Sequence, residues 1–365
     1  MKSLKDFEKD LNKCSKCGLC QAVCPLFKIN PNECSVSKGK FIMLHGVTKG
    51  ELKLSKNINK YLDLCLKCGK CNTFCPSGID VCQILNTAKY EYMKETFSGR
   101  IVKFFQSKDV FSRVLKLFSY LSKPFRADFV TCKTPVHKLV YFKGCVNNIF
   151  PNTDKYINNI FKKSDIEIVT FDFDCCGLPF LSEGNMERFL TAAKTNLKLL
   201  DCDYDYVVTD CASCESTILG YKNYLDDAVK FVKPEKSINW GDLIVIKGLK
   251  FKFDKPIKAT FHKPCHLKND AFLRRVLANC KNVEYIEMDE YDTCCGLAGS
   301  FAIKNHKMSV ELAKLKAQNI IKTGADVVIT TCPVCISGLK YGLKLSGSRI
   351  KVKSILEFLS EGVIK

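Results

Sequence analysis

The stretch Cys175-Cys176-Gly177-Leu178 recurs further along the chain as Cys294-Cys295-Gly296-Leu297. Each Cys-Cys-Gly doublet follows a lone cysteine and precedes a Cys-x-x-Cys pair, so five thiols recur in one order. The two sets are Cys145, Cys175, Cys176, Cys211 and Cys214, and Cys265, Cys294, Cys295, Cys332 and Cys335. Adjacent cysteines on an extended backbone point in different directions. A doublet in which both thiols bind therefore has to hold something polynuclear rather than one tetrahedral ion.

Short β-rich runs precede the cysteines of both sets. They lie at residues 139–142, 166–171 and 206–209, and again at 259–261, 283–286 and 327–330. Helical segments at 187–199 and 308–321 separate doublet from Cys-x-x-Cys, and residues 237–240 correspond to 354–357 in the last helix of each copy. Strands alternating with helices indicate an α/β unit with a mostly parallel sheet. We predict two duplicated α/β domains, residues 137–250 and 251–365, facing each other across a pseudo-twofold axis with their sites at the carboxyl ends of the strands.

Two further cysteine runs lie near the start of the chain, and each ends in Cys-Pro. They read Cys14-x-x-Cys17-x-x-Cys20-x-x-x-Cys24-Pro25 and Cys65-x-x-Cys68-x-x-Cys71-x-x-x-Cys75-Pro76. In bacterial ferredoxins this spacing gives three cysteines to one [4Fe-4S] cubane and the fourth to the other. We therefore assign one cluster to Cys14, Cys17, Cys20 and Cys75, and the other to Cys65, Cys68, Cys71 and Cys24. Zinc knuckles are the alternative, but zinc gives no reason for the Cys-Pro endings.

The ferredoxin-type region is predicted to be helical. The chain between Cys24 and Cys65 is far longer than a compact β-type ferredoxin needs. Apolar residues recur at intervals of three and four residues in 39–44 and 79–92, which is the spacing of an amphipathic helix. We therefore predict an α-helical ferredoxin domain over residues 1–96. The expected fold class is α/β with an all-α part.

Residues 97–136 carry no cluster motif. Their apolar runs are interspersed with Arg100, Lys108, Arg113, Lys123 and Arg126. A basic amphipathic pattern of this kind is typical of a segment at a membrane surface or against a partner subunit. We predict instead a basic amphipathic helical linker over residues 97–136 that packs on its own domains.

The amino-acid composition indicates the cellular environment and the kinds of partner that these sites can have. The chain has 365 residues, 23 cysteines and a formal net charge of +19. We expect no signal peptide, so clustered cysteines in a reducing cytoplasm indicate metal rather than disulfides. Thiolate-bound clusters are net negative and cancel part of the basic excess, and no phosphate-tracking motif accompanies it, so we expect no nucleic-acid partner. No run reaches the length of a membrane span, and any membrane contact is expected to be peripheral, through a partner.

The order Cys…Cys-Cys-Gly…Cys-x-x-Cys, duplicated behind a two-cluster ferredoxin region, resembles the cysteine-rich CCG-domain proteins. These include heterodisulfide reductase catalytic subunits and the iron–sulfur subunits of glycolate, lactate and anaerobic glycerol-3-phosphate dehydrogenases and of thiol:fumarate reductase. The domain order is most similar to the type of heterodisulfide reductase polypeptide that joins ferredoxin and CCG domains in one chain. In that family a complete five-cysteine set is implied to hold a non-cubane four-iron cluster, and a disulfide of two thiol coenzymes is cleaved between two such clusters. The resemblance thus implies two cubanes and one or two non-cubane [4Fe-4S] clusters.

Two functions follow from the resemblance, and we predict the first, with the second as the alternative. In the first, the chain is a disulfide reductase in which both five-cysteine sets are catalytic and reduce a substrate such as the coenzyme M–coenzyme B heterodisulfide. In the second, it only relays electrons for a flavin-dependent dehydrogenase. No Gly-x-Gly-x-x-Gly fingerprint is present, so any flavin belongs to another chain, and the expected partner is a flavoprotein, cytochrome or other redox protein. A purely structural metal scaffold is a third interpretation, which the doubled ferredoxin motif disfavours.

Four residues beside the cysteines are further candidates. Gly177 and Gly296 follow the doublets and lack a Cβ, which lets the backbone approach a bulky inorganic core. His262 and His266 flank Cys265 only, so they are candidates for proton delivery as well as for hydrogen-bonded structural groups. The cysteines outside the motifs are expected to be small buried hydrophobic residues, namely Cys34, Cys82, Cys132, Cys202 and Cys280.

Overall fold

The computed structural model describes residues 2–95, 129, 137–147, 152–232 and 234–364. It divides into two compact units. The first comprises Met1–Val110, Leu178–Phe189 and Cys294–Lys316, and the second comprises Phe111–Gly177, Leu190–Thr293 and Ala317–Lys365. The basic linker predicted at 97–136 lies outside the described residues apart from Phe129.

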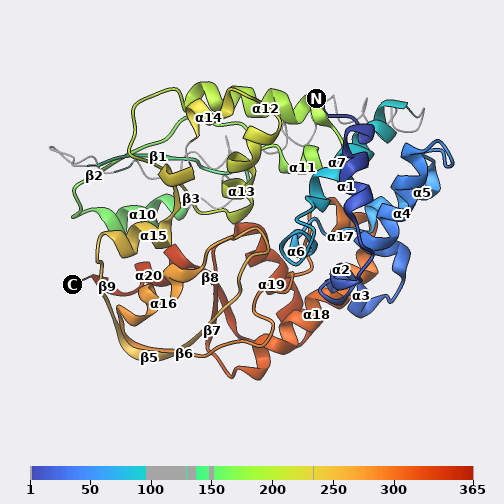
Figure 1. Ribbon diagram of the computed structural model, residues 1–365. Helices are drawn as coiled ribbons and strands as arrows, with labels where there is room; N and C mark the ends of the chain where they lie inside the picture. The colour runs from blue at the N-terminus through green and yellow to red at the C-terminus, as the bar shows by residue number, and fades with distance from the viewer. Residues whose placement is uncertain (1, 96–128, 130–136, 148–151, 233, 365) are drawn as a thin grey trace. The chain divides into compact units, whose positions relative to one another are not determined.

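The N-terminal part of the first unit is helical, and no strand occurs among its described residues 2–95 (Figure 1). Its elements are η1 (Leu4–Phe7), α1 (Glu8–Lys13), α2 (Leu19–Ala22), α3 (Pro25–Ile29), η2 (Glu33–Ser35), α4 (Ser37–Thr48), α5 (Lys56–Asp63), α6 (Lys70–Thr73) and α7 (Val81–Glu95). The helices predicted at 39–44 and 79–92 are therefore confirmed as α4 and α7. The two later segments of this unit add α11 (Leu178–Ser182) and α17 (Ser300–Lys304).

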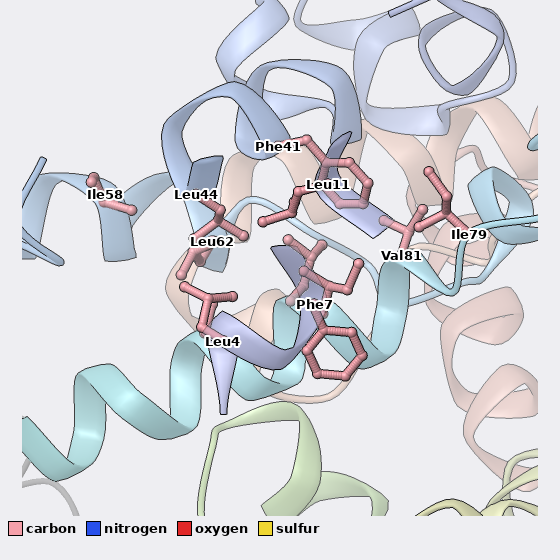
Figure 2. Packing of buried hydrophobic residues seen from close by; sticks show 12 residues of the cluster. Leu4, Phe7, Leu11, Phe41, Leu44, Ile58, Leu62, Ile79 and Val81 are labelled. Atoms are coloured by element: carbon pink, nitrogen blue, oxygen red, sulfur yellow. The ribbon is translucent and has the colours of Figure 1, made fainter. Parts of the chain in front are cut away.

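The core of this helical part forms where η1, α1, α4, α5 and α7 turn their apolar sides inward (Figure 2). Leu4, Phe7 and Leu11 from the first turns meet Phe41 and Leu44 of α4. The cluster also contains Ile58, Leu62, Ile79, Val81, Ile84, Leu85 and Ala88. Cys14, Cys65, Cys71 and Cys75 pack against it, so the same core fixes cysteines of both ferredoxin-type motifs.

The second unit contains two parallel sheets. The first has the order β2-β1-β3-β4, formed by β1 (His137–Tyr141), β2 (Ile166–Val169), β3 (Tyr206–Thr209) and β4 (Ser237–Asn239). Its helices are α10 (Thr153–Phe161), α13 (Ala212–Gly220), α14 (Ala228–Phe231) and α15 (Trp240–Ile246), with η4 (Tyr221–Asn223) and η5 (Pro234–Lys236) between them, and α12 (Met186–Leu199), whose first turn up to Phe189 belongs to the first unit.

The second sheet repeats the topology. Its order is β6-β5-β7-β8, from β5 (Phe251–Phe261), β6 (Cys280–Tyr285), β7 (Val327–Thr330) and β8 (Lys351–Ser354), and β9 (Val363–Ile364) pairs antiparallel with β5. The helices are α16 (Ala271–Ala278), α19 (Pro333–Leu345) and α20 (Ile355–Ser360), and α18 (His306–Lys322) is divided between the two units after Lys316. The equal strand order and connections are those expected of a duplication, and the predicted parallel α/β architecture is confirmed.

One detail of the predicted repeat is wrong. The sequence pattern pairs residues 237–240 with 354–357, yet the N-cap of α15 is Asn239 and that of α20 is Ser354. Each cap side chain accepts a hydrogen bond from the backbone N–H three residues on, at Asp242 and Glu357. Because the caps define the helix starts, Asn239 corresponds to Ser354, and residues 237–239 form a strand rather than a helix.

The carboxyl ends of four strands lead directly to cysteines of the two sets, as predicted, whereas the doublets lie further beyond the ends of β2 and β6. Cys145, Cys211, Cys265 and Cys332 follow β1, β3, β5 and β7 within a few residues. In a sheet of order 2-1-3-4 the chain reverses its direction of growth between the first and third strands, which is where open α/β sheets bind ligands. Among the described residues, no helix is long and apolar enough to cross a membrane.

Candidate metal centres

The first ferredoxin-type motif lines one cavity. Its wall includes Cys14, Cys17, Cys20 and Cys75, which are the four thiols assigned to one cluster from the sequence. The turn between Cys14 and Cys20 depends on two left-handed residues, Lys16 with φ 56° and Gly18 with φ 84°. Such turns let successive cysteines face one point.

The second motif lines another cavity with the other four thiols, Cys24, Cys65, Cys68 and Cys71. Its turn repeats the first, since Lys67 has φ 54° and Gly69 has φ 75°. Cys24 reaches this wall from the N-cap position of α3, with Pro25 as the first helical residue. The crossing of the fourth cysteine into the other cavity therefore has, for Cys24, a structural basis in the helix that begins at Cys-Pro.

Cys82 is a wall residue that sequence analysis missed. It lines the second cavity, and its thiol forms a hydrogen bond with Cys71. That bond is the main reason why the pKa of Cys71 falls to about 6, while the pKa of Cys82 is raised by the same bond and by burial. The expectation that cysteines outside the motifs are buried hydrophobic residues holds for Cys280 but is wrong for Cys202, which is exposed. Cys34 is half-buried, and Cys132 lies outside the described residues.

The first five-cysteine set forms an unbroken string of sulfur contacts within the second unit. The Sγ atoms of Cys145 and Cys175 are 3.5 Å apart. Hydrogen bonds continue the string from Cys175 to Cys176, from Cys176 to Cys214 and from Cys214 to Cys211. The hydrogen bond to Cys145, followed by Cys176 and burial, raises the pKa of Cys175. Five buried or half-buried thiols this close repel one another once ionised, so as a ligand set they suit a polynuclear cation.

Two residues hold the backbone of this doublet. The amide of Asn196 on α12 donates to the carbonyl of Cys175 at 3.2 Å, and its oxygen accepts from the N–H of Asp174 at 2.8 Å. The hydroxyl of Tyr221 donates to the carbonyl of Cys176 at 2.9 Å. Asn196 and Tyr221 are completely buried, so these bonds satisfy peptide groups that have no water. No motif marks them in the sequence.

Acidic and basic side chains also lie behind this site. Asp210, directly before Cys211, accepts hydrogen bonds from Tyr141 and Asn147. Burial raises the pKa of Asp210 to about 7, against the hydrogen bonds that lower it. Lys143 and Asp154 form a buried ion pair of 2.6 Å.

Gly144 allows the close approach of the segment after β1 to the Cys-x-x-Cys turn, and it supports a test. A Cβ at this position would lie 2.9 Å from the Sγ of Cys214. We expect Gly144→Ala to displace that sulfur and to lower the iron bound by this set, while the circular-dichroism spectrum stays unchanged. Gly220→Ala is the matched control, because a Cβ there meets nothing within 4 Å. Equal iron content in the two variants would contradict the placement of Cys214 as a ligand.

The second five-cysteine set is divided between the two units. Cys265, Cys332 and Cys335 belong to the second unit, and Cys294 and Cys295 to the first. In the first unit Cys294 is buried in a cluster with Leu26, Leu66, Phe301 and Leu312. Cys24 and Cys68 of the second cavity pack against this cluster.

The Cys-x-x-Cys turns of the two repeats touch within the second unit. The N–H of Ala212 donates to the carbonyl of Thr331 at 3.2 Å. The thiols of Cys211 and Cys332 share a hydrogen bond, which together with Cys335 lowers the pKa of Cys332. Cys332 is also the N-cap of α19, where backbone N–H groups and the helix dipole favour a thiolate. The predicted proximity of the two repeats therefore has direct contacts at these turns.

The two histidines occupy different environments. His266 contacts the first repeat, with its Nδ1 2.9 Å from the Oγ of Ser213, which stands between Cys211 and Cys214. His262 directly follows β5 and is completely buried, and its backbone N–H donates to the carbonyl of Ile329. His266 thus ties Cys265 of one repeat to the Cys-x-x-Cys of the other.

The backbone conformation also requires glycine after each doublet, and at Gly296 so does the packing of α18, in addition to the expected close approach to an inorganic core. Gly177 and Gly296 have φ 89° and 88°, a region that residues with a Cβ rarely adopt. A Cβ on Gly296 would lie 2.7 Å from the carbonyl oxygen of Ser309 and 2.8 Å from the amide of Ala313. Gly296 therefore accommodates the backbone of α18 against the doublet.

The donor chemistry fits iron–sulfur clusters. Each cavity has four cysteines of the assigned set on its wall, and among the described residues that line the two cavities none is acidic. Sulfur-only sets suit Fe–S clusters, whereas Mg²⁺ and Ca²⁺ require oxygen ligands.

Comparison with known families identifies the class. Residues 139–219 and 259–340 match the cysteine-rich CCG domain, and residues 10–79 match a 4Fe-4S dicluster domain. The chain therefore contains two CCG domains and a 4Fe-4S dicluster domain, which confirms the predicted resemblance to CCG-domain iron–sulfur proteins, and the dicluster match favours iron–sulfur over zinc for the N-terminal cysteines.

The relatives are components of oxidoreductases. A probable glycolate oxidase iron–sulfur subunit of Bacillus subtilis is 23% identical, with 95% of this chain and 92% of the relative covered. One component of the fumarate reductase (CoM/CoB) of Methanothermobacter marburgensis is 25% identical over 96% of this chain and 72% of its own. One component of the dihydromethanophenazine:CoB–CoM heterodisulfide reductase of Methanosarcina barkeri is 22% identical over 97% of this chain and 94% of its own.

A solved structure shares the fold. A hypothetical protein from Helicobacter pylori aligns with 99% of this chain and 76% of its own length, with a TM-score of 0.58 and 13% identity. At this identity the likeness concerns the fold alone.

Proposed function

We propose that the chain is a heterodisulfide reductase-like iron–sulfur oxidoreductase. Electrons pass from two ferredoxin-type clusters, held by Cys14, Cys17, Cys20 and Cys75 and by Cys65, Cys68, Cys71 and Cys24, to the CCG-domain sites, which reduce a disulfide. The observation that carries the proposal is the unbroken string of five sulfurs in the first set, because electron relay through cubanes alone needs no such site.

The reaction consumes two electrons and two protons, breaks one S–S bond and forms two thiols. When bound, iron–sulfur clusters supply single electrons and a Lewis acid that stabilises a cleaved sulfur as thiolate. The residues of the chain orient and protonate. Asn196 and Tyr221 hold the doublet, and in this proposal His262 and His266 are the groups that hold a proton beside Cys265. A coenzyme M–coenzyme B disulfide is the representative substrate.

A relay function is the second candidate. The nearly complete two-way coverage of the probable glycolate oxidase iron–sulfur subunit favours it. In this case the chain would accept electrons from a flavin on a partner protein in a 2-hydroxy-acid, glycerol-3-phosphate or thiol:fumarate type of enzyme, and would perform no bond chemistry itself.

Iron content tests the number of clusters. Four four-iron clusters correspond to about sixteen irons per chain, and two cubanes alone to about eight. We expect about sixteen irons and an equal amount of inorganic sulfide in the anaerobically reconstituted protein. Combined Cys175→Ser and Cys176→Ser exchange should remove about four irons and leave the cubane EPR signals unchanged. About eight irons in the unsubstituted protein would refute filled CCG sites.

Activity distinguishes the two candidates. Reduced viologen should be oxidised when the coenzyme M–coenzyme B disulfide is added to the loaded protein, with one disulfide lost for every two viologens. The doublet variant should lose this activity because the substrate site is incomplete. Rapid reduction of the clusters by reduced viologen without disulfide turnover would favour the relay function.

A further inference from the structure

Both ferredoxin-type cysteine motifs have a lysine at the same position, and the two lysines differ in burial. Lys16 and Lys67 each stand directly before the second cysteine and share a left-handed backbone, with φ 56° and 54°. The side chain of Lys16 is exposed, whereas the Nζ of Lys67 is buried. Lys67 stands two residues after Cys65 and directly before Cys68, and both of these cysteines line the second cavity.

A second pair of lysines on α4 shows the same contrast. Lys40 lines the second cavity, is 1% exposed and donates through Nζ to the carbonyls of Ser35 and Leu64, both at 2.6 Å. Lys38 lines the first cavity, and its Nζ lies 3.4 Å from the carboxylate of Glu33 in a solvent-accessible pair. The carboxylate offsets the charge that Lys38 presents to the first cavity.

The number of basic residues on the walls does not distinguish the cavities. Lys16 and Lys38 line the first, and Lys40 and Lys70 line the second. Water and salt screen exposed charges, whereas a buried ammonium acts through a medium of low dielectric constant. Three of the four assigned cysteines in the first cavity, and all four in the second, are half-buried, and Cys17 is exposed. The cysteines of the two cavities are therefore similarly shielded from water, and the main difference between the cavities is the buried lysine charge beside the second one.

We propose that Lys40 and Lys67 make the site of Cys24, Cys65, Cys68 and Cys71 the higher-potential cubane site, so that an electron in the N-terminal domain collects there. A cluster gains negative charge on reduction, so a buried cation beside it stabilises the reduced form. This site is also the one whose Cys24 and Cys68 pack against the buried cluster that contains Cys294. The inference rests on the proposed assignment of ferredoxin-type clusters to these cysteines.

Redox titration monitored by EPR tests it on the full reconstituted chain. Cys17→Ser and Cys68→Ser each perturb one cubane and assign its signal. In the unsubstituted protein we expect the signal altered by Cys68→Ser to appear at the higher potential. In Lys67→Gln the oxidised-to-reduced ratio of that cluster at a fixed potential should rise about tenfold, equivalent to about 59 mV for a one-electron couple. Lys67→Arg, which keeps the charge, should retain the original potential.

Lys16→Gln is the matched control at the same motif position, with an expected change below about twofold in the first cluster because its charge is screened. Equal shifts in Lys67→Gln and Lys16→Gln, or a higher potential for the signal altered by Cys17→Ser, would overturn the inference. If Lys67→Gln fails to bind iron, the inference is tested by the unsubstituted protein alone, in which the signal altered by Cys68→Ser must have the higher reduction potential of the two. Absence of cubane signals from that protein would refute the proposed function instead.

Discussion

Replacing Lys89 by methionine should lower the free energy of unfolding of the first unit by about 2 kcal/mol, because it removes the more deeply buried of the two lysines that pair with two half-buried carboxylates. The side chain of Lys89 is 5% exposed, and its Nζ lies 2.6 Å from Asp63 and 3.4 Å from Glu183. Lys304 also pairs with both carboxylates, and Ser300 donates to Glu183. These residues join α5, α7, the segment after the first doublet and the segment after the second.

Two variants calibrate the expected loss, measured by anaerobic chemical denaturation. Lys304→Met should cost about 1 kcal/mol or less, because its side chain is 40% exposed and solvent screens it. Lys230→Met removes an exposed pair with Asp227 and should change nothing measurable. A loss in Lys89→Met no larger than in Lys304→Met would show that the buried network does not hold these segments.

The same network predicts a dependence on pH. Burial opposes the ionisation of Asp63 and Glu183, but Lys89 and Lys304 outweigh it and hold both pKa values below the ordinary 3.8 and 4.5. The lowered pKa of each carboxylate contributes stability that is complete above those ordinary values and is lost as pH falls through the lowered ones. We expect the free energy of unfolding to fall below about pH 4.5, and to fall less steeply in Lys89→Met. Parallel pH profiles would contradict this assignment.

Much of the architecture could be predicted from the sequence because it rests on local periodicity. Four-residue runs such as Val327–Thr330, between polar segments, can bury both faces only in a parallel sheet covered by helices. Likewise Cys14 and Cys65 open motifs whose spacing already implies their cavities. The strand limits differ from the predicted ones by a few residues, most at β5, which begins at Phe251 rather than at residue 259.

The residues that sequence analysis missed act across long separations. Asn196 meets Cys175, and Lys89 meets Glu183, only after the chain has folded, and neither pair has a spacing that local periodicity can reveal. Cys82 resembles a spare hydrophobic residue in the sequence because it stands outside the motif run. For the same reason, local sequence patterns could not predict that Leu178–Phe189 and Cys294–Lys316 belong to one compact unit with the N-terminal helices.

The Gly39→Ala substitution should lower the free energy of unfolding of the N-terminal helices by about 3 kcal/mol. Its Cβ would lie 2.2 Å from the carbonyl oxygen of Glu33, 2.8 Å from the carbonyl carbon and 2.9 Å from the Cα of Cys34. All three are backbone atoms, so η2 would have to move away from α4.

That movement would reach both cubane cavities. Ser35, at the end of η2, supplies the carbonyl that Lys40 binds, and Ser37 at the start of α4 lines both cavities. We therefore expect Gly39→Ala to lower the cubane iron content as well as the unfolding free energy, and to weaken both cubane EPR signals together.

Gly46→Ala on the same helix separates this clash from the general effect of a glycine-to-alanine exchange. A Cβ there would approach only the side chain of Leu52, which is 45% exposed and can rotate away. Because alanine is the better helix former, Gly46→Ala should leave stability unchanged or raise it by about 0.5–1 kcal/mol, with full cubane content. If Gly39→Ala matched this control in stability and iron, the close packing of η2 on α4 would not determine the geometry of the cavities.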